Sequence, residues 1–382
     1  MLNGRGTLMI HYICGYANDN SEIKRIFSPA GAMKMEYIFG CFGEIGKEYR
    51  VYSTCQVKSH KFVKKKKEQN IVYRASFKTH NKYTFWLDRI FALIQLFFYL
   101  LRVKKEDYVV VYHERFYLGC VKLISKIKRF KLIYEIEEVY TIAKQYCQKS
   151  INKELSALTK GIKKNLAGYI FPTDLLNNRI NIYGLPYVII HGTYNVENDY
   201  GDKFNDEKIH CVYAGTFDPK KGGVAASATA AQFLDSRYHI HILGFGSEKD
   251  RQLLINQIDE ISEKTKCKIT FEGLKSGEDY NRFIQKCDIG LSTQNPDASF
   301  NDTSFPSKIL SYMANGLRVI TVKIPAIESS AIGKYVYYYQ EQTPESIANA
   351  IKDVDFNDGY CGREIIKELS VKFLSDLDKL LS

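Results

Sequence analysis

The feature that most constrains the fold is an alternation of short apolar runs with amphipathic stretches, and the chain shows it twice. In the first half, runs rich in β-branched and aromatic residues predict strands at 8–14, 49–53, 70–73, 108–112, 131–135, 168–171 and 187–190. Helical periodicity between them predicts helices at 31–43, 84–102, 117–129 and 149–165. Strands that alternate with helices favour an α/β fold with parallel sheets.

The pattern starts again after a polar segment. Residues 191–208, HGTYNVENDYGDKFNDEK, are rich in Gly, Asn and Asp and lack periodicity, as linkers do. Strands then follow at 209–214, 239–243, 268–272, 289–292 and 318–322, with helices at 223–233, 248–262, 278–286, 308–314, 345–352 and 363–381. A length of 382 residues suits two cores.

We therefore predict two Rossmann-like domains that face each other across a cleft. Residues 1–192 form the N-terminal acceptor-binding domain, 193–208 the linker and 209–360 the C-terminal domain. The last helix, 361–382, is expected to pack back toward the N-terminal domain. Ligands in open α/β sheets bind at the carboxyl ends of the strands, so both domains should direct these ends at the cleft.

The formal net charge of +11 favours an anionic partner. Basic residues concentrate at 61–67 and 122–131. Phosphate-bearing small molecules and acidic membrane surfaces both suit this charge, and solvated helix faces are the alternative explanation. No nucleic acid is expected as a partner, because the basic residues are not interleaved with a nucleic-acid-binding module.

Nine cysteines without a C-x-x-C pair, and an opening segment without the features of a secretion signal, predict a cytoplasmic protein without a zinc site. Residues 90–101, IFALIQLFFYLL, are apolar but shorter than the roughly 20 residues that span a membrane. We predict a buried helix there. A helix lying on a membrane is the alternative, since Trp86 and basic residues flank it.

Three strand ends in the second half carry glycines. Residues 212–223, VYAGTFDPKKGG, place Gly215 and Lys221 in a strand-to-helix turn, where the backbone can approach a phosphate. Residues 239–246, HIHILGFG, end a strand at Gly244, and 271–274, FEGL, end another before Leu274. Ordinary surface turns are the alternative for each.

Residues 302–320, DTSFPSKILSYMANGLRVI, carry the strongest signal. Hydroxyl groups precede a helix that begins near Pro306 and has Lys308 in its first turn. A cation at this end opposes the helix dipole, and a bound diphosphate would offset that cost. The group expected at the phosphates is Thr303, Ser304, Pro306, Ser307 and Lys308.

The order YAGTFDPKKG, LGFG, FEG and FPSKILSYMANGLRVIT resembles the retaining glycosyltransferases of the two-Rossmann (GT-B) fold, group 1 or family 4, over about residues 209–350. The resemblance implies a nucleoside-diphosphate-sugar donor and a glycan acceptor, and FPSKI is similar to the polysaccharide-building branches. It places Gly215 and Lys221 at the diphosphate, Leu274 at the base and residues 304–308 around the phosphates.

Two residues depart from the family pattern. Thr216 stands where the family usually has an arginine, and Ser311 stands where a glutamate usually holds the ribose. Lys221 and Lys308 are then left to carry the diphosphate charge. No metal and no other cofactor is expected, since no D-x-D motif stands at a strand end.

The candidate catalytic residues of the N-terminal domain are carboxylates at the end of a predicted strand. Glu135 and Glu137 share one face of a strand end, and Glu138 follows. Relatives of the family often have a histidine where Glu137 stands, so we expect this carboxylate to orient the acceptor hydroxyl or to stabilise positive charge at the sugar. An acidic, solvated helix start is the equal alternative. His113, at the next strand end, is a further catalytic candidate, although a lone histidine at a strand end more often has a structural role.

Two further expectations concern the acceptor. The loop with Gly15, Asn18 and Arg25 should line the cleft, unless it is a plain surface loop. The lysines at 61–67 and the apolar segment 86–101 would dock the enzyme on the inner face of the plasma membrane, near a lipid-linked glycan. The competing function is a nucleotide-sugar epimerase of the same fold, with the Glu135–Glu138 cluster as its acid and base.

Overall fold

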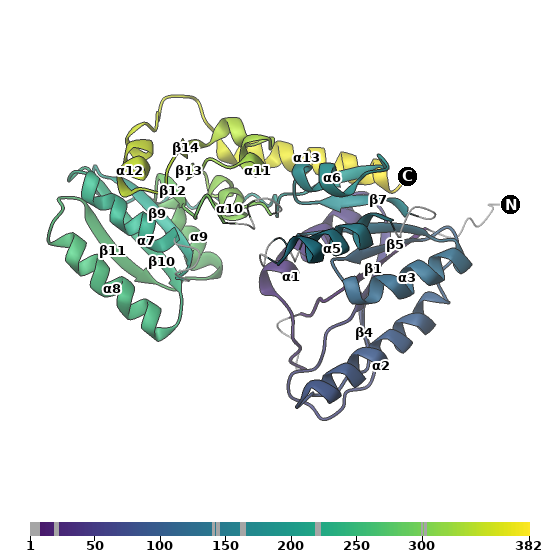
Figure 1. Ribbon diagram of the computed structural model, residues 1–382. Helices are drawn as coiled ribbons and strands as arrows, with labels where there is room; N and C mark the ends of the chain where they lie inside the picture. The colour runs from purple at the N-terminus through teal and green to yellow at the C-terminus, as the bar shows by residue number, and fades with distance from the viewer. Residues whose placement is uncertain are drawn as a thin grey trace.

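The computed structural model describes residues 8–18, 23–139, 142, 146–160, 166–217, 223–298, 301 and 304–382. These residues form two α/β domains, each built on its own sheet, as predicted (Figure 1). The first sheet ends at Ile189 and the second begins at Ile209. The domain boundaries drawn from the sequence fall between these strands and stay a prediction.

The first sheet has the order β3-β4-β2-β1-β5-β6-β7-β8 and is parallel except for β3. Its strands are β1 (Met9–Cys14), β2 (Glu48–Ser53), β3 (Lys66–Glu68), β4 (Ile71–Tyr73), β5 (Tyr108–Tyr112), β6 (Lys131–Glu135), β7 (Leu166–Phe171) and β8 (Tyr187–Ile189). Its helices are α1 (Pro29–Glu44), α2 (Lys82–Leu100), α3 (Arg115–Lys128), α5 (Gln148–Lys160) and α6 (Asp174–Ile180).

Helices cover both faces of this sheet. Alternate strand residues such as Tyr12 and Val110 pack in one core with α1 and the C-terminal helix. The intervening residues, such as Val109 and Val111, pack in a second core with α2, α3, α5 and α6. Burial on both faces explains why these strands read as continuous apolar runs.

The second sheet is parallel, in the order β11-β10-β9-β12-β13-β14. Its strands are β9 (Ile209–Thr216), β10 (Tyr238–Phe245), β11 (Lys268–Gly273), β12 (Ile289–Ser292), β13 (Arg318–Val322) and β14 (Tyr337–Tyr339). The helices are α7 (Gly223–Thr229), α8 (Glu248–Ser262), α9 (Gly277–Gln285), α10 (Lys308–Ala314), α11 (Pro325–Glu328), α12 (Pro344–Lys352) and α13 (Gly362–Leu380), with short 3-10 turns at Ala230–Phe233 and Gly333–Tyr335.

Several short elements were not predicted. They are β3, β14, α6 and α11, each too short to show a clear period. β3 falls inside the lysine run, where Lys67 pairs with Val72 in antiparallel register. Lysines suit this position because β3 is an edge strand, and charged side chains keep an edge from pairing with another chain.

The last helix, α13, returns to the N-terminal domain as predicted and lies along the top of both domains in Figure 1. It contacts α10 in the C-terminal domain and β8 in the N-terminal domain. The Tyr37 hydroxyl of α1 lies 2.9 Å from the Ser370 hydroxyl, and the Tyr37 ring packs at 5.9 Å from the Phe373 ring. The helix therefore fastens the two domains together.

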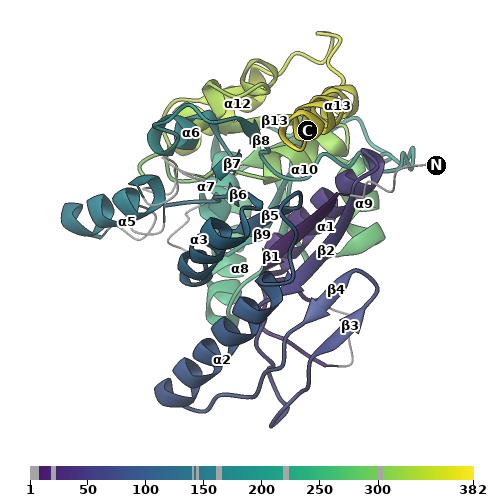
Figure 2. The ribbon, with the colours of Figure 1, turned by 90° about the vertical axis from the view of Figure 1, so that its right-hand side faces the viewer.

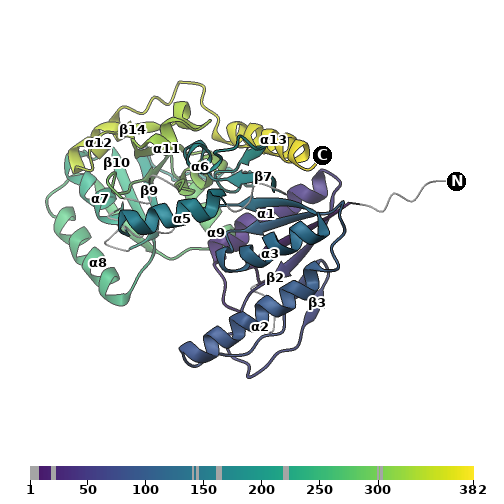
Figure 3. The same cartoon turned by 45° about the vertical axis from the view of Figure 1, so that its right-hand side comes forward.

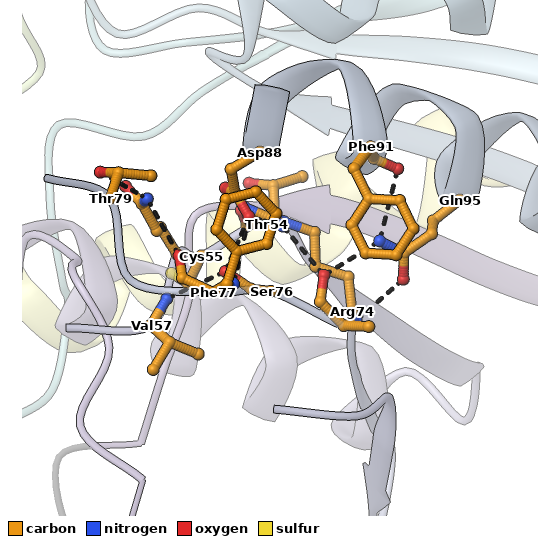
Figure 4. A network of polar contacts seen from close by, with 12 residues as sticks. Thr54, Cys55, Val57, Arg74, Ser76, Phe77, Thr79, Asp88, Phe91 and Gln95 are labelled. Atoms are coloured by element: carbon orange, nitrogen blue, oxygen red, sulfur yellow. Dashed lines mark hydrogen bonds and ion pairs between the residues drawn. The ribbon is translucent and has the colours of Figure 1, made fainter. Parts of the chain in front are cut away.

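A buried ion pair joins the segment after β4 to α2 (Figure 4). Arg74 Nη2 lies 2.5 Å from Asp88 Oδ2, and Arg74 also donates from Nε to the Thr54 carbonyl at 2.9 Å. Asp88 Oδ1 accepts from the Ser76 hydroxyl at 3.0 Å. Both charged side chains are nearly inaccessible, so each needs the other.

The prediction of a buried helix at residues 90–101 is wrong for one face of α2. Ala92, Leu96 and Leu100 are buried, whereas Ile90 and Phe98 are 50% and 55% exposed. One side of α2 packs against α3 and against residues of the sheet. The helix lies at the edge of the domain (Figures 2 and 3), and its other, apolar side is exposed. Among the described residues, no helix is long and apolar enough to cross a membrane.

Candidate active site

Two adjoining cavities lie where the domains face each other. One, of about 660 Å³, is lined from the N-terminal domain by Lys34 and Glu137, among others, and from the C-terminal domain by α9 and α10. The other, of about 510 Å³, is lined by Glu138 and by the ends of β9, β10 and β12. Both include Ser304, Phe305 and Ser307, so they form one continuous cleft. This is the edge where the sequence predicted the site.

The smaller cavity gathers most of the residues predicted to bind the donor. They are Gly215, Thr216, Ser304, Pro306, Ser307 and Lys308. The Lys308 ammonium lies 4.1 Å from the centre of the Tyr213 ring. A Cβ on Gly215 would lie 2.1 Å from Lys308 Nζ, so only glycine leaves room for the lysine head group. Gly215 therefore positions a cation in the cleft.

Gly244 supports this arrangement from the neighbouring strand and does not itself line the two cavities. It pairs in register with Gly215 and has φ +142°, in the region that favours glycine. A Cβ there would lie 1.7 Å from the Gly215 carbonyl oxygen. The close approach of the two strands thus depends on Gly244. The prediction that Gly244 contacts the donor stays a prediction, and its structural role is packing.

The short helix α10 is held under the cleft by a hydrogen bond to β9. The backbone N–H of Ala214 donates to the Tyr312 hydroxyl at 2.8 Å. Ser307 precedes the helix with helical dihedrals and makes no capping hydrogen bond. Because α10 has only seven residues, its dipole is weak, and the charge of Lys308 is the main attraction for an anion.

On the facing domain, Glu137 is paired with a lysine that the sequence analysis did not consider. Lys34 Nζ of α1 donates to Glu137 Oε1 at 2.5 Å and lies 3.8 Å from Glu135 Oε1. The lysine side chain is 8% exposed and that of Glu137 25%. Glu137 therefore presents an ion-paired carboxylate to the larger cavity.

Glu135 lies behind this pair and lines neither cavity. Its Oε2 accepts a short hydrogen bond from the Tyr12 hydroxyl. Complete burial raises the pKa of Glu135 to about 8, against the opposing effect of Lys34. The expectation that Glu135 and Glu137 point to the same place agrees with their shared lysine, although only Glu137 and Glu138 reach the cleft.

His191 was also missed, and it lines the larger cavity just before the linker. Its Nδ1 lies 2.7 Å from the Pro172 carbonyl oxygen, which can only accept, so the proton is on Nδ1 and Nε2 is the basic nitrogen. The ring stacks on Phe305 at 4.4 Å. Burial lowers the pKa of His191 to about 4, so the ring is neutral near pH 7.

Ser311 lines the larger cavity beside a group of polar residues. Its hydroxyl lies 3.3 Å from the Tyr280 hydroxyl. Asn281 donates to Glu197 Oε2 at 2.6 Å, and both residues line the same cavity. The linker thus brings a carboxylate close to the place where the sequence lacks the family's glutamate.

Besides Glu135 and Gly244, five predicted residues are absent from the two cavities. Leu274 is 66% exposed, and His113 lines a separate cavity with Arg89 and Arg115. The other three, Gly15, Asn18 and Arg25, make packing contacts: a Cβ on Gly15 would meet Glu114, Asn18 N donates to the Tyr73 hydroxyl, and Arg25 Nη1 donates to the Cys55 carbonyl. Lys221 and Thr303 lie outside the described residues.

Lys34 was missed because its partner is distant in the sequence. Lys34 is separated from Glu137 by 103 positions and lies in the first turns of an amphipathic helix, where a lysine is ordinary. The only local signal was the start of α1, where Ser28 accepts from Gly31 N and Pro29 follows. Helix starts after parallel strands point at the same edge as the strand ends, so residues on this turn were candidates.

Comparisons with known proteins agree with this geometry. The model of the family Glycosyl transferases group 1 matches residues 208–354. Among solved structures, sucrose-phosphate synthase from Thermosynechococcus elongatus is 11% identical, with 98% of each chain covered and a TM-score of 0.68. The α,α-trehalose 6-phosphate synthase from Burkholderia multivorans is 9% identical, with 98% of this chain and 95% of that chain covered and a TM-score of 0.65.

HepE of Anabaena, solved in complex with UDP and glucose, is 12% identical, with 97% of this chain and 98% of that chain covered and a TM-score of 0.64. At these identities the structural likeness establishes the fold, which is the two-Rossmann arrangement predicted from the sequence. The family match covers the domain that carries Gly215 and Lys308. Together they identify the enzyme as a glycosyltransferase.

Proposed function

We propose that the enzyme transfers a sugar from a nucleoside-diphosphate sugar to a hydroxyl of a glycan acceptor, with retention of configuration. The observation that carries the proposal is the continuous cleft, in which Lys308 on one domain and the Glu137–Lys34 pair on the other border the same three residues, Ser304, Phe305 and Ser307. HepE, which shares the fold, was solved with UDP and glucose.

In this proposal, the donor diphosphate lies at Lys308 and the glycine-lined end of β9. The lysine neutralises the charge that develops on the leaving diphosphate, and the hydroxyls of Ser304 and Ser307 add polar contacts. We propose that the cations of the chain do this without a metal ion. Undiminished turnover after treatment with EDTA supports that part, and activity that returns only with Mg²⁺ or Mn²⁺ contradicts it.

Glu137 has the role of a fixed carboxylate. Its pairing with Lys34 at 2.5 Å fixes the position of the carboxylate, which orients an acceptor hydroxyl and stabilises positive charge at the anomeric carbon. His191, neutral and with Nε2 basic, offers a second acceptor for a sugar hydroxyl in the same cavity. Glu197, in the cavity that Ser311 also lines, takes the place of the missing ribose-binding glutamate.

The test is a screen of donors by thermal shift, followed by turnover of the Lys308→Ala variant with the donor that binds. A donor that binds only the native state raises the melting temperature. We expect Lys308→Ala to lower turnover at least tenfold, about 1.4 kcal/mol. Lys264→Ala is the matched control, because Lys264 is exposed at the end of α8. Equal rates in the two variants contradict the assignment of the donor site.

An epimerase of the same fold is the rival function, and the family match favours the transferase. Product analysis without acceptor separates them. A transferase gives slow hydrolysis of the donor at most, whereas an epimerase converts the free nucleotide sugar to its epimer. The Glu135–Glu138 cluster also fits the transferase better, because Glu135 is sealed from the cleft and Glu137 is ion-paired.

We further propose a lipid-linked acceptor in polysaccharide biosynthesis and a peripheral position on an acidic membrane. The support is the apolar outer face of α2 with Ile90, Ile94 and Phe98, continued on α3 by Leu123 and Ile127, each about half exposed or more. Arg102 and Lys126 lie at the ends of these two helices. An apolar stripe with a basic margin suits the boundary between acyl chains and acidic headgroups.

Sedimentation with vesicles tests the membrane proposal. An Ile90→Ser, Ile94→Ser, Phe98→Ser variant should lose binding to vesicles that contain phosphatidylglycerol, while neutral vesicles bind the wild type weakly. A Lys64–Lys67 alanine variant tests whether the lysine run contributes. Binding that is unchanged in both variants removes the membrane from the proposal and leaves the transfer reaction untouched.

A further inference from the structure

Strand register brings three histidines together on one face of the second sheet. His210 on β9 pairs with His239 on β10, and His241, two residues further, points to the same face. All three are buried. One ring nitrogen of each lies within 4.8 Å of one from each of the others. None of the three lines the cleft, so the donor and acceptor sites do not account for them.

In each histidine, the ring nitrogen that points away from the other two histidines forms a hydrogen bond with an oxygen atom. We call it the outer nitrogen, and the other ring nitrogen the inner one. His210 Nε2 lies 2.7 Å from Asp206 Oδ1, and His241 Nδ1 lies 2.9 Å from Glu272 Oε1. A carboxylate only accepts, so these two nitrogens carry the protons. The Thr270 hydroxyl donates to Glu272 at 2.7 Å, which leaves its oxygen to accept from His239 Nε2 at 2.9 Å.

This pattern leaves a lone pair on the inner nitrogen of every ring. His210 Nδ1 and His241 Nε2 are 2.9 Å apart, and two lone pairs at that distance repel each other unless a proton or a metal ion lies between them. Neutral imidazoles with their other N–H bound to a carboxylate are the usual form of metal-binding histidines.

We propose that His210, His239 and His241 bind a zinc ion that joins the linker to the second sheet. Zinc accepts imidazole at about 2.0–2.1 Å, so two tetrahedral ligands stand about 3.3 Å apart. The pair at 2.9 Å needs to open by only a few tenths of an ångström. Three nitrogen ligands favour zinc over magnesium or calcium, which prefer oxygen.

The surroundings favour a structural ion. The Phe204 ring of the linker stacks on His210 at 4.1 Å and on His241 at 4.9 Å, and the Phe283 ring of α9 packs against His241 at 5.3 Å. Asp206, also in the linker, holds His210 from the same side. Bound zinc would therefore tie the linker to β9 and β10 and would stabilise the domain without touching the reacting groups.

The test uses the full chain, stripped with a chelator and dialysed against Zn²⁺ or Co²⁺. We expect one equivalent of zinc, visible absorption of the Co²⁺ form typical of tetrahedral nitrogen ligation, and a melting temperature raised by about 5 °C on adding zinc. A His239→Asn, His241→Asn variant should lose all three. His60→Asn is the control, because His60 is exposed in the other domain.

A milder variant covers the case in which the double substitution does not fold. Glu272→Gln keeps all three rings and removes the carboxylate behind His241, so zinc affinity measured against a chromophoric chelator should fall about 10- to 100-fold. Wild-type protein that takes up no zinc and shows no Co²⁺ absorption overturns the proposal without any variant. Zinc retained by the double variant overturns it as well, because the ion then binds elsewhere.

Discussion

The two domains build the facing edges of the cleft in different ways. In the C-terminal domain the edge is made of backbone: Gly215 leaves room for the Lys308 head group, and Gly244 allows the strands to approach. In the N-terminal domain it is made of charged side chains, with Lys34 paired to Glu137 and close to the buried Glu135. An edge formed by glycine backbone is specified by short motifs in the sequence. An edge formed by paired side chains needs residues that come from distant elements.

The contrast extends beyond the cleft. The N-terminal domain also holds α2 through the buried Arg74–Asp88 pair, at 2.5 Å. The N-terminal domain therefore contains two ion pairs with little access to water, Lys34–Glu137 and Arg74–Asp88. Removal of one partner from a buried ion pair leaves the other charge without compensation.

Asp88→Ala should cause the largest loss of stability, about 3–5 kcal/mol, because Arg74 stays buried without its partner. Chemical denaturation measures it. The double variant Arg74→Met, Asp88→Leu is the control and should recover most of the loss, since an apolar pair needs no compensation. A single variant as stable as the wild type would show that α2 is held by its apolar contacts alone.

Gly244→Ala and Gly215→Ala should differ in kind. At Gly244 the added Cβ meets the backbone oxygen of Gly215, and φ +142° is strained for alanine, so we expect a loss of about 3 kcal/mol in stability. At Gly215 the Cβ meets the flexible end of Lys308 and, at 3.2 Å, the Tyr213 hydroxyl, but no backbone atom. Gly215→Ala should therefore fold almost as well as the wild type and lose about tenfold in turnover.

Thermal melts and initial rates on the same two preparations test this pair. Equal destabilisation by both substitutions would mean that Gly215 serves strand packing in the way Gly244 does. Turnover unaffected by Gly215→Ala would mean that Lys308 does not need its present position for the reaction.

The same contrast explains how far the sequence alone reaches. The alternation of strands and helices predicts both sheets, and the segments around Gly215 and Lys308 come together as their motif order implies. These are local patterns. Lys34 and Glu137 meet only because α1 and β6 converge at one edge, and no local pattern reports that. His113 and Arg25 also look functional in sequence, yet neither lines the cleft. His113 lines a separate cavity and its Nδ1 accepts from the Glu137 backbone N–H at 3.3 Å, and Arg25 donates to the Cys55 carbonyl.

The three histidines show a signal that sequence reading can use. His239 and His241 alternate on a predicted strand, and His210 lies near the start of the strand before it. Residues two apart share a face, so such a pair beside a third histidine on a neighbouring parallel strand predicts a cluster. Whether His210 joins the pair depends on the register of β9 against β10, because a shift of β9 by one residue would turn His210 to the opposite face of the sheet.

Lys34→Met should reduce turnover by about tenfold, about 1.4 kcal/mol. The loss of stability should be smaller than in Asp88→Ala, because the Glu137 side chain is 25% exposed and water can reach its charge. The substitution keeps the volume of the side chain and removes the charge that holds Glu137 in place. Lys47→Met is the control, because Lys47 makes a surface ion pair with Asp378 at 3.3 Å, and such pairs contribute little. Unchanged turnover in Lys34→Met would mean that the Lys34–Glu137 ion pair is structural and has no part in the reaction.

The smallest effect concerns pH and Glu135. Burial raises the pKa of this carboxyl from 4.5 to about 8, so the protonated form is favoured in the folded state. The group's contribution to stability is then fully present below pH 4.5 and is lost as the pH rises through about 8. Glu135→Gln should remove this dependence, with a change on the order of 1 kcal/mol between pH 7 and 8 in denaturant titrations.

The Lys34→Met variant sharpens the same measurement. Lys34 lowers the pKa of Glu135 against the effect of burial, so its removal should shift the loss of stability to higher pH. If Glu135→Gln and the wild type lose stability in parallel over this range, Glu135 is already ionised in the folded state. The N-terminal edge would then hold two charged carboxylates against one lysine, and the cleft would present more negative charge to the acceptor than we propose.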